Sequence, residues 1–123
     1  MSGVLNLAET LFCPNEGIAP YAESGMSVAL DTNGADAVLI IGTFMVEFPP
    51  HGGVFIRPTI DGTGMNTDPQ IAQFGSYFDS HRAMISFSRA YSVSPGEHKF
   101  GLEWGCRDGA DIVTGGMTVV PLR

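Results

Sequence analysis

The sequence predicts an all-β protein, an antiparallel β-sandwich of about seven to eight strands. Apolar runs alternate with turn residues along the whole chain, and no window has the period of a helix. The clearest run places Phe100, Leu102, Trp104 and Cys106 on one face of a half-buried strand, because side chains alternate with period two. The 16 glycines and 8 prolines fall singly between such runs, which is typical of turns. We expect a single domain over residues 1–123.

The expected strands follow the apolar runs in chain order. They cover residues 4–12, 26–31, 37–48, 54–61, 83–93, 99–106 and 110–122, and a break at Gly115-Gly116 can divide the last one. Residues 65–79 are irregular, so we expect a surface loop there with one short turn of helix around residues 71–74. Asp108-Gly109 predicts a tight hairpin turn between the last two strands.

The run of residues 37–46 is apolar at successive positions, so both of its faces are apolar. Strands of this kind normally lie between helices, and this chain predicts none. A neighbouring subunit could cover the second face, and the alternative is the loop of residues 62–80. Charged residues make up only 15% of the chain against a usual value of about 25%, which also favours burial against a subunit. The interface candidates are Val38, Leu39, Ile40, Ile41 and Phe44.

Charge and hydropathy exclude two classes of partner. The formal net charge is -7, and Lys99 is the single lysine beside five scattered arginines. No basic stripe could therefore neutralise nucleic-acid phosphates or an anionic membrane. No apolar run approaches the roughly 18 residues of a membrane span, and residues 1–6 lack the basic start of a signal peptide. We expect no membrane insertion and no export by a signal peptide.

Catalytic and metal-binding motifs are missing from the sequence. His51, His81 and His98 do not form an HxH or HExxH pair, so neither a metal nor another cofactor is expected. The chain has no GxSxG motif, and its candidate serines, including Ser94, lie in turn-like segments. We therefore expect a protein that is not an enzyme. Cys13 and Cys106 predict buried free thiols, with a disulfide between them as the alternative.

Two weaker ligand sites can be drawn from the sequence. Residues 31–36 and 61–68 are acidic loops that offer oxygen ligands for calcium, but they lack EF-hand spacing and read first as hairpin turns. A loop over residues 77–82 combines an aromatic ring with polar side chains, as a sugar platform requires. Its candidate ligand residues are Tyr77, Asp79, His81 and Arg82.

Two side chains in the predicted strands have distinctive expected positions. Arg89 interrupts an apolar row in the run of residues 83–93, so it must lie at a rim, pair with an acid or mark a bulge. Trp104 lies mid-strand on an apolar row, and we expect it in the core.

The layout from Gly42 onward resembles small viral and phage jelly rolls. The resemblance rests on the strands of residues 42–48, 54–61 and 83–93, the turn Asp61-Gly62-Thr63, and the stretch from Ser94-Pro95-Gly96 through Trp104. It also looks like the trimeric jelly rolls of the complement and tumour necrosis factor type. This resemblance implies a homotrimer and carries over no functional residue.

The expected function is that of a non-enzymatic structural protein of a virion, most specifically a phage capsid decoration or cement protein. Its partners would be capsid or tail proteins of the same particle, and it would be made in the host cytoplasm. The alternative is a carbohydrate-binding or host-attachment module that uses the loop of residues 77–82 to bind a host glycan.

Overall fold

In a computed structural model, the chain is described over residues 3–6, 11–12, 18–65, 71–74 and 81–122. For residues 3–6, 11–12, 18–26, 73–74 and 81 the description is of the backbone. These residues form ten strands: β1 (Gly3–Asn6), β2 (Leu11–Phe12), β3 (Ile18–Asp31), β4 (Ala37–Phe48), β5 (Gly53–Ile60), β6 (Thr63–Gly64), β7 (Ile71–Phe74), β8 (His81–Ser92), β9 (Glu97–Arg107) and β10 (Asp111–Leu122).

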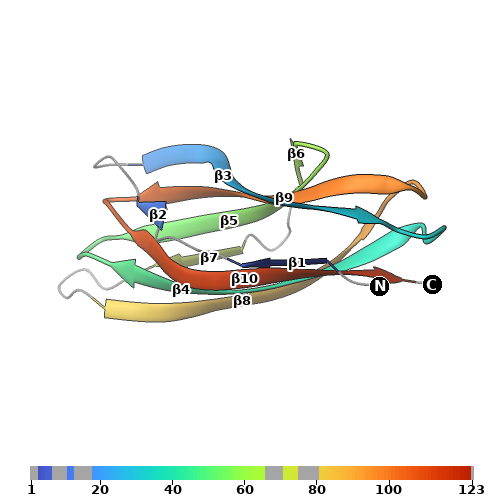
Figure 1. The fold of residues 1–123 in the computed structure, drawn as a ribbon. Coiled ribbons are helices and arrows are strands. Elements are labelled where there is room, and N and C mark those ends of the chain that lie inside the picture. Colours follow the sequence, from blue (N-terminus) through green and yellow to red (C-terminus); the bar gives the residue numbers. More distant parts are fainter. Residues whose placement is uncertain (1–2, 7–10, 13–17, 66–70, 75–80, 123) are drawn as a thin grey trace.

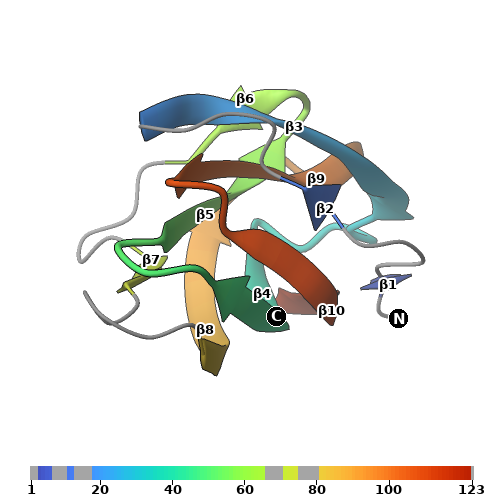
Figure 2. The same cartoon turned by 90° about the vertical axis from the view of Figure 1, so that its left-hand side faces the viewer.

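The strands form two sheets that pack face to face (Figures 1 and 2). Sheet A has the order β1-β10-β4-β8, and β2 also pairs with β10. Sheet B has the order β3-β9-β5-β6, and β7 also pairs with β5. All strand pairs are antiparallel, so the predicted jelly-roll-like β-sandwich is confirmed.

Several element boundaries differ from the sequence prediction. The run predicted over residues 4–12 contains two separate strands, β1 and β2, and β3 begins eight residues before the predicted start at residue 26. The expected helical turn at residues 71–74 is wrong, because this segment pairs with β5 as strand β7. The irregularity in β10 lies between Ile112 and Thr114, where the register with β4 shifts, and not at Gly115-Gly116.

Three turns have the residue types that their backbone requires. A two-residue turn of type I′ needs positive φ at both positions, which Asn-Gly and Asp-Gly adopt at low cost. The φ pairs are 52° and 82° for Asn33-Gly34, 53° and 82° for Asp61-Gly62, and 55° and 81° for Asp108-Gly109. The expected tight turn at Asp108-Gly109 is present, but the expected hairpin is wrong, because the turn joins β9 of sheet B to β10 of sheet A and these two strands do not pair.

The core lies between the inner faces of the two sheets. On β9 the alternating residues Phe100, Leu102, Trp104 and Cys106 are all buried, with Trp104 only 9% exposed. This confirms both the predicted face of the strand and the core position of Trp104. On the facing sheet, the ring of Phe44 in β4 stacks on the ring of Phe87 in β8, and the two ring centroids are 6.4 Å apart.

Two glycines make room for this ring pair, which is formed by Phe44 and Phe87. A Cβ added at Gly42 would lie 2.3 Å from the Phe87 ring, and one added at Gly115 would lie 2.3 Å from the Phe44 ring. Both glycines are therefore required by close packing of the rings and not by backbone conformation.

The expectation of free thiols is wrong. Cys106 is disulfide-bonded. It is buried at 2% exposure on the inner face of β9. The only other cysteine of the chain is Cys13, which lies outside the described residues. The sequence left this bond as the alternative because a pair of distant cysteines does not reveal whether the fold brings them together.

Candidate functional site

Strand β4 alternates between core and surface, which divides the five subunit-interface candidates into two groups. Val38, Ile40 and Phe44 have no exposed area, so they belong to the core of this chain and their assignment to a subunit interface is corrected. Leu39 and Ile41 lie on the other face of the strand, and Ile41 is 40% exposed. A partner subunit could contact only these last two candidates.

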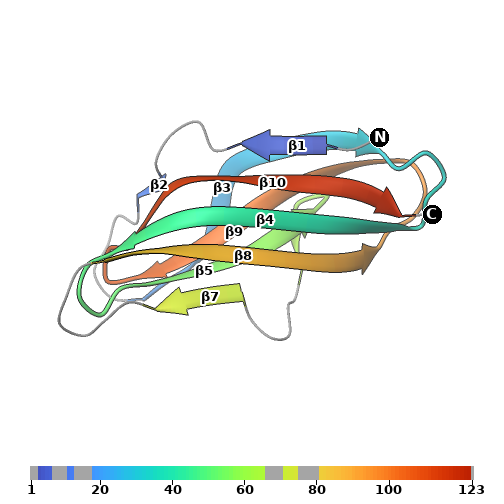
Figure 3. The ribbon, with the colours of Figure 1, turned by 90° about the horizontal axis from the view of Figure 1, so that it is seen from below.

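Leu39 and Ile41 are part of a continuous surface that we call the outer face of sheet A. Figure 3 looks onto this sheet, with β10, β4 and β8 side by side. The strand register places ten outward positions next to one another: Leu39, Ile41, Thr43 and Met45 of β4, Met84, Ser86, Ser88 and Ala90 of β8, and Thr118 and Val120 of β10. None of these ten side chains is charged. Met84 is 53% exposed, so large apolar side chains face solvent at two places on this surface.

Among the described side chains of β4, β8 and β10, charge on the outer face of sheet A appears only at one end. There Arg82 of β8 lies opposite Glu47 of β4, and the Arg82 Nε lies 3.3 Å from the Glu47 Oε1. Both side chains are about half exposed, so the pair adds little stability. This ion pair therefore marks the boundary of the uncharged surface at this end of the sheet.

The outer face of sheet B is chemically different. Along β9 the outward positions include Glu97, Lys99, Glu103 and Arg107. Arg57 of β5 donates to Glu103 over 2.7 Å, and the two side chains are 30% and 12% exposed. Because charged side chains are costly to desolvate, covering this surface would cost more than covering the uncharged face of sheet A.

A polar cluster at one end of the sandwich joins side chains from separate turns. His98 Nδ1 lies 2.6 Å from the Asp61 Oδ2, and its Nε2 lies 2.5 Å from the Ser94 carbonyl oxygen and 3.3 Å from the Ser94 Oγ. The Lys99 backbone N–H donates to the other oxygen of Asp61 over 2.9 Å. The turn that follows β3 is linked to the same region, because the Gly96 N–H donates a hydrogen bond to Thr32 Oγ1 over 3.0 Å.

The cluster shifts the pKa of both titrating side chains. The hydrogen bond to the Asp61 carboxylate, and then the one to the Ser94 carbonyl, raise the pKa of His98 above its ordinary 6.5. The hydrogen bonds from His98, and then from the Lys99 backbone, lower the pKa of Asp61 below its ordinary 3.8. Both side chains are therefore mostly ionised between these two ordinary pKa values, 3.8 and 6.5.

Ser94, His98 and Asp61 have the composition of a catalytic triad but not its chemistry. A general base must hold an unprotonated Nε2 toward the serine hydroxyl. Here the Nε2 of His98 lies 2.5 Å from the Ser94 carbonyl oxygen, which can only accept a hydrogen bond, so Nε2 donates to it and is not held as a base toward the hydroxyl. The sequence did not predict this cluster, because Asp61, Ser94 and His98 were each considered singly and their separation along the chain does not show that the fold brings them together. We interpret the cluster as a structural tie between turns.

The predicted sugar-binding residues are only partly described. Tyr77 and Asp79 lie outside the described residues, and His81 is described by its backbone alone, at the start of β8. Arg82 faces outward and pairs with Glu47, as described above. The carbohydrate site therefore stays a prediction.

The described residues contain neither a cluster of metal-binding side chains nor a membrane-spanning helix. Within the described ranges, no group of three or more His, Cys, Asp or Glu side chains is placed to hold a metal ion. The described residues also include no helix that is both long and apolar enough to cross a membrane. In the loops considered for calcium, Asp31 accepts the Asn33 N–H over 2.8 Å and Asp61 serves the cluster with His98.

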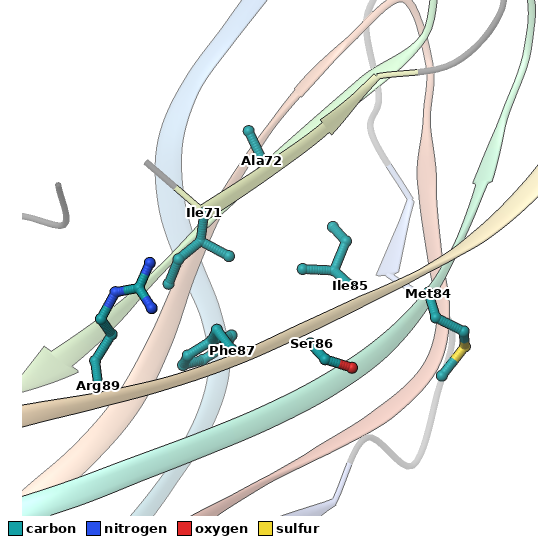
Figure 4. A pocket seen from close by; sticks show the side chains of 7 residues that line it. All are labelled: Ile71, Ala72, Met84, Ile85, Ser86, Phe87 and Arg89. Carbon is teal, nitrogen blue, oxygen red and sulfur yellow. The ribbon is translucent and has the colours of Figure 1, made fainter. Parts of the chain in front are cut away.

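A cavity of about 220 Å³ opens between β7 and β8, at the side of the sandwich where the two sheets part (Figure 4). Ile71 of β7 and Ile85, Phe87 and Arg89 of β8 point into the space between the strands, whereas Met84 and Ser86 point away. The register of β8 with β4 is unbroken, so Arg89 does not mark a bulge. It lies half-buried at the rim of this cavity, which was one of the predicted positions.

Comparison with known proteins gives the fold and no closer relationship. No protein-family model and no curated protein sequence matches this chain. The structure of infectious bursal disease virus, Gx strain, superposes with a TM-score of 0.63 at 13% identity over 98% of this chain and 32% of that one. The VP2 subviral particle of the same virus gives 0.61 at 11% identity with the same coverage of both chains.

A carbohydrate-binding domain matches less well. The CBM36-1 domain of a multidomain xylanase from the hindgut metagenome of Trinervitermes trinervoides gives a TM-score of 0.49 at 5% identity, over 100% of this chain and 99% of that one. This chain spans about a third of the length of the viral chains that it matches. At such identities the viral likeness establishes a shared jelly-roll-like fold and nothing about partners. The similarity to complement and tumour necrosis factor jelly rolls stays a prediction.

Proposed function

We propose that this chain is a non-enzymatic structural protein of a virion, which binds the particle surface as a decoration subunit and associates as a homotrimer. The observation that carries the proposal is the uncharged outer face of sheet A in a chain of net charge -7. Protein interfaces are depleted of charge at their centre, because charged groups are costly to desolvate. Ile41 and Met84 give this face the exposed apolar side chains that such a contact requires.

Two further observations support the proposal. The fold is one that a viral capsid protein also uses, as the superposition on infectious bursal disease virus VP2 indicates. The disulfide at Cys106 is a bond that persists in oxidising surroundings such as a virion surface outside the cell. Both observations fit a protein that must stay folded after its particle has left the host.

The oligomeric state is tested by placing a charge on the outer face of sheet A. The wild-type protein should be a trimer by mass photometry and by light scattering at micromolar concentration. Ile41→Asp and Leu39→Asp should yield monomers, because each puts a carboxylate into the proposed interface. The matched control is Ala29→Asp, which adds the same charge at an exposed position of β3. A wild-type monomer would contradict the trimer.

The virion assignment is tested on gradient-purified particles from the virus that encodes the chain. Quantitative mass spectrometry should find the chain at a fixed ratio to the major capsid protein. Particles that lack the chain should rebind the added wild-type protein and the Ala29→Asp control, but not Ile41→Asp. Absence of the chain from purified particles would refute the assignment, whatever its oligomeric state.

A further inference from the structure

The two ring nitrogens of His98 cannot both keep their present contacts once the ring is neutral. Nδ1 lies 2.6 Å from the Asp61 Oδ2, and Nε2 lies 2.5 Å from the Ser94 carbonyl oxygen. A carbonyl and an ionised carboxylate can only accept hydrogen bonds, so each contact needs a proton on the ring nitrogen. A neutral imidazole carries a single N–H. When His98 loses a proton, one of the two hydrogen bonds must therefore break.

The hydrogen bond to Ser94 is the one that should break. An N–H donates a stronger hydrogen bond to a carboxylate than to a neutral carbonyl, because the carboxylate is charged. Neutral His98 should therefore keep the proton on Nδ1, toward Asp61, and lose the proton on Nε2. The Nε2 lone pair then faces the Ser94 carbonyl oxygen, and two acceptors at this distance repel each other.

A replacement partner for Nε2 is present on the same residue. The Ser94 Oγ lies 3.3 Å from Nε2, and a hydroxyl can donate a hydrogen bond as well as accept one. Within the described part of the chain, the hydrogen-bond contacts of the His98 ring are those with Asp61 and Ser94. Ser94 can thus hold either form of the ring, with its carbonyl when Nε2 is protonated and with its hydroxyl when Nε2 is not.

We propose that His98 and Ser94 form a pH-operated latch, in which loss of the Nε2 proton exchanges the Ser94 carbonyl for the Ser94 hydroxyl as the partner of Nε2. The Ser94 peptide group has to turn away from the ring during this exchange, because its carbonyl oxygen is repelled by the lone pair. The latch is a property of the fold, so it does not depend on whether the chain belongs to a virion.

The latch acts on the connection between two turns at the end of the sandwich where β10 ends (Figure 1). Gly96 donates to Thr32 Oγ1 over 3.0 Å, and its carbonyl oxygen accepts the Thr32 N–H over 2.9 Å. Thr32 has no exposed area, so these two bonds hold the turn after β3 against the turn after β8. Gly96 is only two residues from Ser94, so rotation of the Ser94 peptide group should loosen both bonds. The connection should be tight at acidic pH and looser once His98 is neutral.

Asp61 is the charged group that acts on the ring. The neighbours of His98 along β9 point to the opposite face of the strand, and the residue of β3 that pairs with Glu97 does the same. The hydrogen bonds of Asp61 and of the Ser94 carbonyl are what raise the pKa of His98. The other titratable side chains on the surrounding segments do not contribute to this shift; they are Asp31, Asp36, Tyr91, Glu97 and Lys99.

The exchange gives Ser94 a conformational role and not that of a nucleophile. The neutral state directs an unprotonated Nε2 at the hydroxyl, as in a catalytic triad. A triad also needs backbone donors for the oxyanion, and the residue after Ser94 is Pro95, which has no N–H.

An NMR titration of the ¹⁵N- and ¹³C-labelled full chain follows the latch directly. The ring signals of His98, assigned by comparison with His98→Asn, show which nitrogen keeps its proton, and we expect Nδ1. The amide signals of Thr32 and Gly96 should shift with the same midpoint as the ring. After correction for the intrinsic effect of pH, these two amides should exchange at least about tenfold faster above the midpoint than below it, as expected for the loss of a hydrogen bond.

Ser94→Ala separates the latch from a purely structural role of the cluster. In the proposed exchange the hydroxyl stabilises the neutral ring, so its removal should raise the pKa of His98 above that of the wild type. Ser94→Thr keeps a hydroxyl and should restore the wild-type pKa. Ser92→Ala is the matched control, because it removes the same group from an exposed position two residues earlier and should leave the pKa of His98 unchanged. Asp61→Asn should lower that pKa, because it removes the carboxylate.

Three results would overturn the proposal. One is a neutral His98 that keeps its proton on Nε2, since the Ser94 carbonyl could then remain its partner. Another is a lowered or unchanged pKa in Ser94→Ala, which would mean that the hydroxyl does not donate to the neutral ring. The third is a set of Thr32 and Gly96 amide signals that do not follow the titration of His98. The wild-type titration needs no variant to fold, so it remains decisive if Ser94→Ala folds poorly.

Discussion

Trp104 is the chain's single tryptophan, so its fluorescence reports on one place in the core. It lies on the inner face of β9 at 9% exposure, with β5 and β3 paired on either side of the strand. Trp104→Ala should lower the free energy of unfolding by about 3–5 kcal/mol. A domain has only about 5–15 kcal/mol available, so the variant should be close to unfolding, as measured by denaturant titration.

The emission of the wild-type protein checks the same burial without a mutation. Native Trp104 should emit at short wavelength and be poorly quenched by iodide, and unfolding should reverse both properties. Trp104→Phe serves as the control, because it keeps an aromatic ring in the core and should lose less stability than Trp104→Ala. Long-wavelength, readily quenched emission from the native protein would place Trp104 on the surface.

The pair of His98 and Asp61 predicts a pH dependence of stability. The raised pKa of His98 stabilises the fold fully below the ordinary value of 6.5, and this contribution is lost as the pH rises through the folded pKa. The lowered pKa of Asp61 stabilises the fold above the ordinary value of 3.8, and this contribution is lost as the pH falls through the folded pKa. The combined contribution should therefore be largest between these two ordinary values.

Melting temperatures measured from acidic to mildly alkaline pH test this prediction. The wild-type melting temperature should fall above pH 6.5 relative to that of His98→Asn, which cannot titrate there. Ser94→Ala is the matched control, because it removes only the weaker 3.3 Å contact and keeps the carbonyl acceptor. If the wild type and His98→Asn melt in parallel across this range, the cluster does not act as an ion pair.

At the scale of strands, periodicity was informative wherever the two faces differ in chemistry. β9 alternates apolar residues with charged residues or glycine, so its inner row could be read directly. The inner face of β4 could not be assigned in the same way, because Leu39 and Ile41 on the surface are as apolar as Val38 and Ile40 in the core. Its ends were predicted correctly, but the sequence alone could not say which alternate residues face inward.

The stacked rings of β4 and β8 depend on a glycine between them. Gly42→Ala places a Cβ 2.3 Å from Phe87 and 3.0 Å from Phe44, so both rings must shift. Overpacking of this kind should cost about 1–3 kcal/mol in the free energy of unfolding, measured by denaturant titration. Ser88→Ala, on the exposed face of β8, should change it by less than about 0.5 kcal/mol. Equal stability of the two variants would show that the rings are loosely packed.

At the scale of the whole molecule, the disulfide at Cys106 connects distant parts of the chain. With Cys13 as the only other cysteine, it closes a loop of about 90 residues, for which chain entropy gives a stabilisation of about 4–5 kcal/mol. Cys106→Ala should therefore be much less stable than the wild type without reductant. With a thiol reductant the difference should shrink to the cost of the lost side chain. Equal differences in both conditions would show that the bond contributes nothing.

The features that required the three-dimensional fold are those that join distant segments. The fold class and the Asp-Gly turns followed from local pattern, because turn chemistry and alternation are properties of neighbouring residues. The cluster of Asp61, Ser94 and His98 did not, since nothing in the sequence says that these turns meet at one end. The contrast between the outer faces of the sheets was hidden for the same reason: each face combines strands that are far apart in sequence.

The position of β10 has a consequence for synthesis. β10 follows the other nine described strands along the chain, yet in sheet A it lies between β1 and β4. Before β10 is synthesised, the only neighbour of β4 in sheet A is β8. Gly3 of β1 then has no pairing partner, because that partner is Val119 of β10. Sheet A can therefore be completed only once the chain has been synthesised as far as β10, and until then the edges of β1 and β4 that pair with β10 have no partner.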